Sequence, residues 1–423
     1  RQNMKRICVI GLGYVGLPTA SMFATHDFEV LGVDKNPEVI SRLQRGEVHI
    51  FEPGLKVLVE AALNSKNFVA SMKVRKSDVF VICVPTPLKE RKADLSHLKE
   101  AATSISHHLR KDNLVISEST VPPKTTKEVL APILENSGLK TGKDFYLAYC
   151  PERVLPGKIL REIVTNDRII GGYDTLSAKE AEKLYSTFVE GKLYLTDSTT
   201  AEVVKLSENT FRDVNIAFSN ELALICEEIE VNAFKVIEFA NRHPRVYIHK
   251  PGCGVGGHCI PIDPFFLVEK RKFSKLISIS REINANMPLH LVELSETALR
   301  SFGISLKNAS ILILGASYKE NTDDARESPT RYMAEELKRR GASLKIFDPH
   351  VKEFEFEIEK SLNFKNLDCL ILSTAHEVFR DIDLFELKRG MRTPLIVDGR
   401  NFFDEKKLLK LGFSYVGIGK KKI

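Results

Sequence analysis

Short β-rich hydrophobic runs alternate with amphipathic helical stretches from Lys5 to about Leu195, and this alternation constrains the fold most strongly. Parallel strands need a helical crossover between them, so the pattern predicts a parallel sheet covered by helices. The alternation resumes after about Phe302, where a helix with Ser328 as N-cap and Pro329 in its first turn ends near Gly341. The predicted strands are ICVIG, EVLGVD, DVFVICV, NLVISEST, FYLAYCPE and RIIGG, and later SILILG, LKIFDP, DCLILST and PLIVDG.

The middle of the chain has a different texture. Residues 199–241 carry apolar side chains at helical spacing without a proline, which predicts one long helix or two abutting ones. Residues 242–264 contain four prolines and four glycines, so they are predicted to form a shaped loop. We therefore predict an α/β fold with two doubly wound lobes, residues 1–198 and 303–423, joined by a central helical region with a long spine helix, residues 199–302.

The composition is that of a globular protein, with 43% hydrophobic and 28% charged residues. The 62 basic and 56 acidic residues give a net charge of +6, too scattered for a nucleic-acid site. No stretch approaches the roughly 18 apolar residues of a membrane span. Seven cysteines without a C-x-x-C pair imply no disulfide framework. We therefore expect a cytoplasmic protein with no nucleic-acid or membrane partner.

The sequence ICVIGLGYVG places Gly11, Gly13 and Gly16 directly between a predicted strand and a predicted helix. In this context the first glycine permits a tight turn, the second lets the backbone approach a pyrophosphate, and the third allows close helix packing. Asp34 ends the next strand, where a carboxylate accepts hydrogen bonds from a free ribose 2′-hydroxyl. The pattern predicts NAD binding and favours NAD over NADP, although Lys35 leaves the second cofactor open.

The glycine-rich loop HKPGCGVGGHCIPIDP offers a reactive cysteine. Cys259 lies beside His258 and four residues before Asp263, a setting that favours a nucleophilic thiolate. Zinc is the alternative, because His249, Cys253, His258 and Cys259 are zinc-ligand types, but their spacing matches no usual zinc motif. We therefore predict no metal.

A cysteine nucleophile and NAD together point to one chemistry. Loss of hydride from a carbonyl adduct of the thiol gives a thioester, which water hydrolyses to an acid. Lys205 and Asn209 lie one helical turn apart in KLSEN, where they can stabilise an oxyanion. Without a further signal, the two side chains read equally well as solvated polar residues.

Several motifs then resemble, in order and spacing, those of the nucleotide-sugar 6-dehydrogenases, the UDP-glucose/GDP-mannose dehydrogenase family. They are GLGYVG, Asp34, CVPTPL, STVPP, YCPERVLPG, KLSENTFRDVNIAFSNELA, GVGGHCIPIDP, SYKENTDDARESP and VDGRN. The resemblance covers nearly the whole chain. It implies an N-terminal NAD lobe, a central region through which a homodimer or a higher homo-oligomer forms, and a C-terminal lobe that binds the UDP part of a UDP-sugar.

The resemblance also implies roles for individual residues. Cys259 would form the thiohemiacetal and the thioester, Lys205 and Asn209 would stabilise the oxyanion, and Glu152 would activate water. Asp263 and Thr120 would lie near that water. The cofactor would be held by Gly11, Gly13, Tyr14, Val15, Gly16, Asp34, Pro85, Thr86, Thr120 and Arg326. The substrate would be held by Arg153, Lys205, Asn209, Arg242, His243, Arg245, Gly256, Lys319 and Arg400.

One departure bears on the sugar. Pro156 stands where the UDP-glucose branch places a second acidic residue, and CPERVLPG resembles the N-acetylhexosamine branch instead. Residues 241–259 resemble the enzymes that act on UDP-N-acetyl-D-mannosamine. The expected reaction is therefore the oxidation of that sugar at C6, with UDP-N-acetylglucosamine and UDP-glucose as alternative substrates. A non-catalytic sensor of NAD or UDP-sugar is a more remote alternative.

Overall fold

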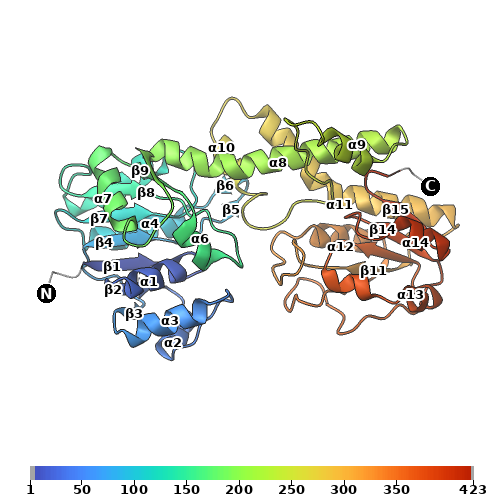
Figure 1. Ribbon diagram of the computed structural model, residues 1–423, viewed down its shortest axis with the longest axis horizontal. Coiled ribbons are helices and arrows are strands. Elements are labelled where there is room, and N and C mark those ends of the chain that lie inside the picture. Colours follow the sequence, from blue (N-terminus) through green and yellow to red (C-terminus); the bar gives the residue numbers. More distant parts are fainter. Residues whose placement is uncertain (1–4, 421–423) are drawn as a thin grey trace. The chain divides into compact units, whose positions relative to one another are not determined.

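The computed structural model describes residues 5–420. Contacts divide the chain into two compact units, residues 1–208 with 265–269, and residues 209–264 with 270–423. Each unit is built on its own sheet with helices packed against it (Figure 1). The predicted α/β class, with two Rossmann-like lobes and a central helical region, is confirmed.

The described part of the first unit contains an eight-stranded sheet with the order β10-β9-β8-β7-β4-β1-β2-β3. Its strands are β1 (Arg6–Ile10), β2 (Glu29–Val33), β3 (Phe68–Ser71), β4 (Val79–Ile82), β7 (Leu114–Ser117), β8 (Tyr146–Tyr149), β9 (Arg168–Gly172) and β10 (Leu193–Asp197). The sequence analysis does not predict β3 and β10. Both lie at sheet edges and bury few side chains, so they lack a clear hydrophobic run.

Alternate residues of one strand point into two different cores, as the two-residue period of a strand requires. Ile7 and Val9 of β1 pack in one core, and Cys8 and Ile10 pack in the other. The first core includes residues of α1 (Gly16–Thr25), α2 (Pro37–Gln44), α3 (Leu55–Asn64), α6 (Ile159–Thr165) and α7 (Thr175–Tyr185). The second includes residues of α4 (Ser96–Ser106), η1 (Thr126–Leu130) and α5 (Ala131–Leu134). Helices therefore cover both faces of the sheet.

Strand β9 departs from the predicted parallel arrangement, because it runs antiparallel to β8. Tyr149 pairs with Gly171 and Ala148 with Gly172. The chain therefore starts β9 at the edge where β8 ends. Continuing the same register places Arg168, the first residue of β9, opposite Glu152.

The carboxyl ends of β1, β4 and β7 meet at one edge of the first sheet. They lead into Gly11, the segment that begins at Cys83, and Thr120. Strand β1 lies between β2 and β4, so the chain switches direction across the sheet beside it. Ligands of doubly wound sheets bind at such a switch point.

Two smaller elements complete the first unit. A short hairpin pairs β5 (Leu88–Lys89) with β6 (Lys92–Ala93), and the 3-10 turn η2 (Glu135–Ser137) follows α5. Residues 265–269 also pack with this unit. They comprise the end of helix α10 (Asp263–Val268) and Glu269, whose carboxylate accepts the Ala93 N–H at 3.2 Å.

A buried carboxylate anchors the segment that follows Thr120. Glu202 is fully buried, and its Oε1 accepts the Thr126 N–H and hydroxyl at 2.7 and 2.6 Å. Its Oε2 accepts the Lys124 N–H at 2.5 Å. Burial raises the pKa of the Glu202 carboxyl to about 7, because desolvation outweighs these hydrogen bonds.

This pKa shift predicts a pH-dependent stability. A carboxyl whose pKa is raised in the folded state holds its proton more tightly there, so its contribution to the unfolding free energy is largest below pH 4.5. That contribution falls by about 3 kcal/mol as pH rises to 7. In denaturant titrations across this window, Glu202→Gln should lack the fall, and the exposed neighbour variant Glu128→Gln should retain it. Parallel curves for wild type and Glu202→Gln would contradict the prediction.

The second unit contains a parallel sheet with the order β12-β11-β13-β14-β15. Its strands are β11 (Ser310–Leu314), β12 (Ser343–Phe347), β13 (Cys369–Leu372), β14 (Leu395–Asp398) and β15 (Ser414–Gly417). Ile311 and Ile313 face one core, and Leu312 and Leu314 face the other. Its helices are α9 (Ala233–Ala240), α11 (Lys275–Ser301), α12 (Pro329–Arg339), η3 (Glu377–Asp381), α13 (Leu384–Gly390) and α14 (Glu405–Lys410).

Residues 199–241, for which the sequence predicted one long helix or two abutting ones, form two helices. Helix α8 (Ser198–Glu228) is a long continuous helix (Figure 1), and α9 follows it after a short turn that Asn232 caps. Helix α12 begins as predicted, with the Ser328 side chain accepting the Thr330 N–H and Pro329 in the first turn.

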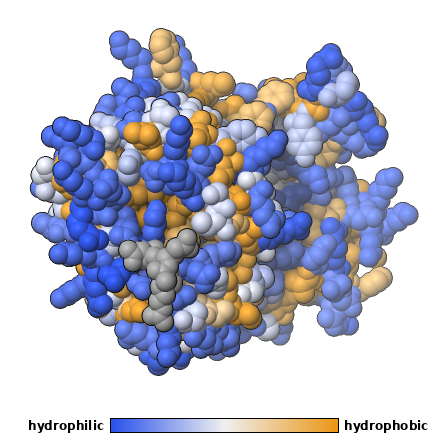
Figure 2. Space-filling model, turned by 60° about the vertical axis from the view of Figure 1, so that its left-hand side comes forward, coloured by the Kyte–Doolittle hydropathy of each residue, from blue (hydrophilic) through white to orange (hydrophobic). Residues whose placement is uncertain are grey.

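Hydrophilic side chains cover much of the face that Figure 2 brings forward, with hydrophobic side chains scattered between them. Among the described residues, none of the helices combines the length and the apolar character that crossing a bilayer requires.

Candidate functional site

The glycine loop after β1 is shaped by two close backbone approaches. Gly11 has a φ of +91°, and a Cβ added there would lie 2.6 Å from the Cys83 carbonyl oxygen. A Cβ on Gly16 would lie 1.7 Å from the Gly11 carbonyl oxygen. A Cβ on Gly13 would meet no protein atom within 4 Å. Packing therefore explains Gly11 and Gly16, whereas Gly13 leaves room for a ligand against the backbone, as a pyrophosphate requires.

Asp34 is held just beyond the end of β2 by two backbone N–H groups. Its Oδ2 accepts the Leu12 N–H and its Oδ1 accepts the Asn36 N–H, both at 2.9 Å. The carboxylate is therefore fixed against the glycine loop, which also contains Tyr14 and Val15. These residues fit NAD: Gly13 would leave room for the pyrophosphate, and Asp34 would accept hydrogen bonds from the ribose.

The two neighbouring strand ends are tied together. The Thr86 hydroxyl, next to Pro85, donates to the Thr120 carbonyl oxygen at 2.5 Å, and the Ser119 hydroxyl donates to the Val84 carbonyl oxygen at 2.7 Å. The structure thus brings the predicted cofactor residues of β1, β2, β4 and β7 to one edge of the first sheet.

The segment that carries Glu152 is fixed by helix α8. The Lys205 ammonium donates to the Glu152 main-chain carbonyl at 2.8 Å. One turn further, the Glu208 carboxylate pairs with the Arg153 guanidinium, with Oε1 2.6 Å from Nη2. Glu152 and Arg153 therefore lie against the helix that carries Lys205, and Lys205 retains donors for a further partner.

Cys259 lies in a turn of the glycine-rich loop in the second unit. Its main-chain carbonyl accepts the Asp263 N–H at 2.8 Å, and the cysteine is only partly buried. Asp263 is buried, and its Oδ2 accepts the Asn209 amide at 2.6 Å. The Asn209 oxygen in turn accepts the Arg212 guanidinium at 2.7 Å. This fixes which way the Asn209 amide points, and its second N–H is available to an oxyanion.

A chain of buried hydrogen bonds leads to the start of this loop. Arg281 donates to Asp213, which accepts Asn284, and Asn284 accepts Asn220. The Asn220 oxygen accepts the Gly252 N–H at 2.9 Å. All four side chains are buried, so the helices α8 and α11 fix the first glycine of the loop.

The remainder of the loop packs against residues 317–327. The Gly257 N–H donates to the Arg326 carbonyl at 2.9 Å. A Cβ on Gly256 would lie 2.5 Å from the Tyr318 Cβ, so a side chain there is excluded. The Ser317 hydroxyl donates to the Lys319 carbonyl at 2.8 Å. The structure thus places Gly256, Lys319 and Arg326 in one pair of packed loops.

The predicted arginines lie in different settings. The Arg400 Nε donates to the Ser373 carbonyl at 2.8 Å, and its Nη1 would lie 2.7 Å from a Cβ on Gly252, so it belongs beside the loop. Arg242, His243 and Arg245 are instead exposed on the segment after α9. The contacts within the second unit therefore do not bring these three residues to the cysteine loop.

Cys253, one of the four residues of zinc-ligand type, has a hydrogen-bond partner in the second unit. The Cys253 sulfur is buried and donates to the Ser373 carbonyl at 3.3 Å. Within residues 5–420, no three His, Cys, Asp or Glu side chains gather to hold a metal ion.

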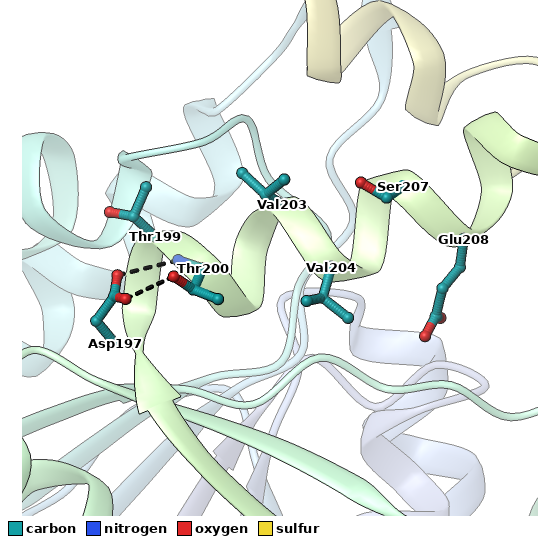
Figure 3. Close-up of a pocket in the computed structure, with 7 residues that line it drawn as sticks. All are labelled: Asp197, Thr199, Thr200, Val203, Val204, Ser207 and Glu208. Atoms are coloured by element: carbon teal, nitrogen blue, oxygen red, sulfur yellow. Dashed lines mark hydrogen bonds between the residues drawn. The ribbon is translucent and has the colours of Figure 1, made fainter.

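A hollow of about 440 Å³ lies along the first turns of α8 (Figure 3). Figure 3 shows the Asp197 carboxylate accepting from the Thr200 N–H and hydroxyl at the start of the helix. The hollow is lined by Asp197, Thr199, Thr200, Val203, Val204, Ser207 and Glu208. It contains none of the predicted site residues and does not mark the site.

Sequence reasoning missed Arg168 and Glu118. Arg168 contacts Glu152 and the buried Glu118, and Glu118 also accepts from Tyr185. The available signal was a charge inside a hydrophobic run, Glu118 in NLVISEST and Arg168 at the start of RIIGG. Cys83, assigned to a strand by sequence, lies one residue beyond β4 and contacts Glu118 at 3.5 Å.

Three family models match the chain in order. They describe the NAD binding, central and UDP binding domains of the UDP-glucose/GDP-mannose dehydrogenase family, over residues 5–189, 199–286 and 312–405. Together with the glycine loop and the doubly wound units, they define an NAD-dependent nucleotide-sugar dehydrogenase.

Relatives match over nearly the full length. A UDP-N-acetyl-D-mannosamine dehydrogenase of Methanococcus maripaludis is 45% identical, covering 99% of this chain and 97% of its own. The structure of a UDP-D-ManNAc dehydrogenase from Pyrococcus horikoshii gives a TM-score of 0.92 at 43% identity, covering 99% and 100%. That of a UDP-N-acetyl-mannosamine dehydrogenase from Staphylococcus aureus gives 0.88 at 40%, covering 98% and 99%. The chain belongs to the UDP-glucose/GDP-mannose dehydrogenase family.

Proposed function

We propose that the chain oxidises the C6 hydroxymethyl group of UDP-N-acetyl-D-mannosamine to a carboxylate in two NAD-dependent steps. The relatives named for this sugar support the substrate, as does Pro156 in the segment CPERVLPG. The observation that carries the chemistry is the setting of Cys259, a partly buried thiol in a glycine-rich turn. Five of the other six cysteines are buried.

The proposed roles follow from the chemistry of each side chain. Bound NAD would accept one hydride in each oxidation, and the hydroxyl proton would pass to water. The Cys259 sulfur bonds to the carbonyl carbon of the C6 aldehyde, and a proton passes to the carbonyl oxygen, forming a thiohemiacetal. Loss of a hydride from that carbon and of the hydroxyl proton leaves a thioester. Lys205 and Asn209 carry the N–H donors that stabilise the oxyanion formed at each addition.

Hydrolysis completes the reaction. Water attacks the thioester carbon, Glu152 takes the water proton, and the C–S bond breaks so that Cys259 leaves as a thiolate. We assign Asp263 and Thr120 to the surroundings of this water. Arg153, Gly256, Lys319 and Arg400 are assigned to the nucleotide sugar, whose diphosphate suits arginine and lysine donors. The exposed Arg242, His243 and Arg245 are assigned to the nucleotide sugar bound by the partner subunit.

A stoichiometric assay tests this function. NADH is measured at 340 nm with limiting UDP-N-acetylmannosamine, UDP-N-acetylglucosamine or UDP-glucose in parallel. We expect two NADH per UDP-N-acetylmannosamine and little from the others. Two NADH from another sugar would overturn the substrate, one NADH would overturn the thioester, and none from any sugar would support a sensor instead.

We further propose that the chain forms a homodimer through helix α8. Phe211, Phe218 and Ile225 recur at seven-residue intervals and are 66%, 52% and 47% exposed, and Ile229 one turn on is 63% exposed. A seven-residue apolar repeat marks one face of a helix that pairs with another helix. The seven free thiols support a reducing compartment, the cytoplasm, for this assembly.

A charged residue in the middle of this face should separate the subunits. We expect Phe218→Asp to sediment as a single chain of 47.6 kDa where the wild type sediments as a dimer. Phe385→Asp is the matched control, since Phe385 is 73% exposed on α13 and lies outside the central helix. A Phe218→Asp variant that remains dimeric would place the interface elsewhere.

A further inference from the structure

Two buried carboxylates share one guanidinium beneath the segment that carries Glu152. Arg168 Nη1 lies 3.3 Å from Glu118 Oε1, and Nη2 lies 3.0 Å from Glu152 Oε2. The Glu118 side chain is 0% exposed, Arg168 is 5% exposed and Glu152 is 9% exposed. Water contributes little to this arrangement, so both carboxylates depend on the Arg168 guanidinium.

Among residues 5–420, Arg168 is the charged group that pairs with Glu118, which also has several neutral donors. The Tyr185 hydroxyl donates to Oε1, and the Thr19 hydroxyl and the Cys83 thiol contact Oε2 at 3.4 and 3.5 Å. The Arg168 guanidinium stacks on the Tyr185 ring, 4.5 Å from its centroid. Burial and the neighbouring Glu152 charge raise the pKa of Glu118, while Arg168 lowers it. Glu118 is therefore built into the network and competes with Glu152 for one cation.

The geometry fixes how the Glu152 carboxylate is oriented, since Oε2 accepts from Arg168 and Oε1 accepts the Arg153 N–H at 2.7 Å. A carboxylate has about four acceptor positions, which leaves room for a water.

We infer that Arg168 and Glu118 are positioning residues for thioester hydrolysis: Arg168 orients the Glu152 carboxylate, and Glu118 holds the Arg168 guanidinium in place. The inference rests on the proposed role of Glu152. The step itself is unchanged, with the water proton going to Glu152, the C–S bond breaking and no electrons leaving the substrate.

Few charged groups of the described residues lie around Glu152, so the effect of each single substitution can be interpreted. They are Arg168 on β9, Glu118 after β7, and Lys205 on α8, which donates to the Glu152 main-chain carbonyl. Arg153 follows in the same segment and is paired with Glu208 of α8. Arg168→Gln removes the cation, and Glu118→Gln removes the competing anion while keeping the shape of the side chain.

The test follows the acyl-enzyme directly. Full-length enzyme is mixed with NAD and UDP-N-acetylmannosamine and quenched in acid, and the mass of the Cys259 peptide reports the fraction acylated. We expect Arg168→Gln to hydrolyse the thioester at least about tenfold more slowly, with KM for both substrates nearly unchanged. Glu118→Gln keeps an oxygen that can accept from the guanidinium, so it should slow hydrolysis less than Arg168→Gln does.

Slower hydrolysis at a nearly unchanged KM is the signature of the inference, because general damage to the fold would weaken substrate binding as well. Arg168→Lys keeps a positive charge and should recover part of the hydrolysis rate. This variant also keeps the inference testable if Arg168→Gln folds poorly. Arg392→Gln is the control, since it breaks an arginine–carboxylate pair in the second unit, 2.6 Å from Asp368.

Glu152→Gln separates the two levels of the proposal. Accumulated acyl-enzyme in Glu152→Gln, with wild-type hydrolysis in Arg168→Gln, would overturn the inference alone. Rapid hydrolysis in Glu152→Gln would overturn the hydrolytic role of Glu152 and the inference with it.

Discussion

Cys259→Ser is expected to lower kcat by at least about 10³-fold while leaving NAD affinity unchanged. A serine hydroxyl is a far weaker nucleophile than a thiolate, and the resulting ester would not be the thioester that water attacks readily. NAD binding should survive because the glycine loop and Asp34 lie in the first unit, whereas Cys259 lies in the second.

The measurement is NADH production at saturating substrate, together with NAD titration by calorimetry. Cys226→Ala serves as the control, since Cys226 is a buried thiol of α8 that the mechanism does not use. NADH production near the wild-type rate by Cys259→Ser would rule out a covalent intermediate on this residue.

Gly16→Ala and Gly13→Ala are expected to fail in different ways, although the glycines lie in one loop. A Cβ on Gly16 would lie 1.7 Å from the Gly11 carbonyl oxygen, so the loop must move, at a cost of about 1–3 kcal/mol of stability. A Cβ on Gly13 would meet no protein atom within 4 Å, so stability should be nearly unchanged. NAD affinity should nevertheless fall at least about tenfold, because the methyl group takes the place of the pyrophosphate.

Thermal unfolding without NAD and NAD titration together separate the two effects. Gly46→Ala is the control, since Gly46 has a positive φ and open surroundings but lies outside the loop. Unchanged NAD affinity in a stable Gly13→Ala protein would remove the pyrophosphate from this loop.

Much of the fold follows from local sequence. The buried strands β1, β4 and β13 are continuous apolar runs, and Ser328 with Pro329 marks the start of α12. The edge strands β3 and β10 were harder to predict, because an edge strand buries too few side chains to produce a clear hydrophobic pattern in the sequence. The antiparallel direction of β9 depends on how residues 150–167 fold back, and no local propensity encodes that path.

The candidate site divides in the same way. Motifs point to Gly13, Asp34 and Cys259 because the residues that make each one a candidate are its neighbours in the sequence. Arg168 was missed, since its contact with Glu152 comes from a pairing register that local sequence does not encode. The Asn220 contact with Gly252 spans 32 residues and likewise appears only after the helices have packed.

The segment that follows Cys259 also limits how this protein can be dissected. Residues 265–269 belong to the first unit, although they are separated from its other residues by 209–264. Arg91 lies over the Phe265 ring at 5.9 Å, and Glu269 accepts the Ala93 N–H. A fragment ending at Glu208 would therefore lose native partners of its own hairpin. The two units are not interchangeable modules that a single cut or a simple gene fusion can separate, and an isolated NAD-binding fragment would need residues 265–269 grafted back.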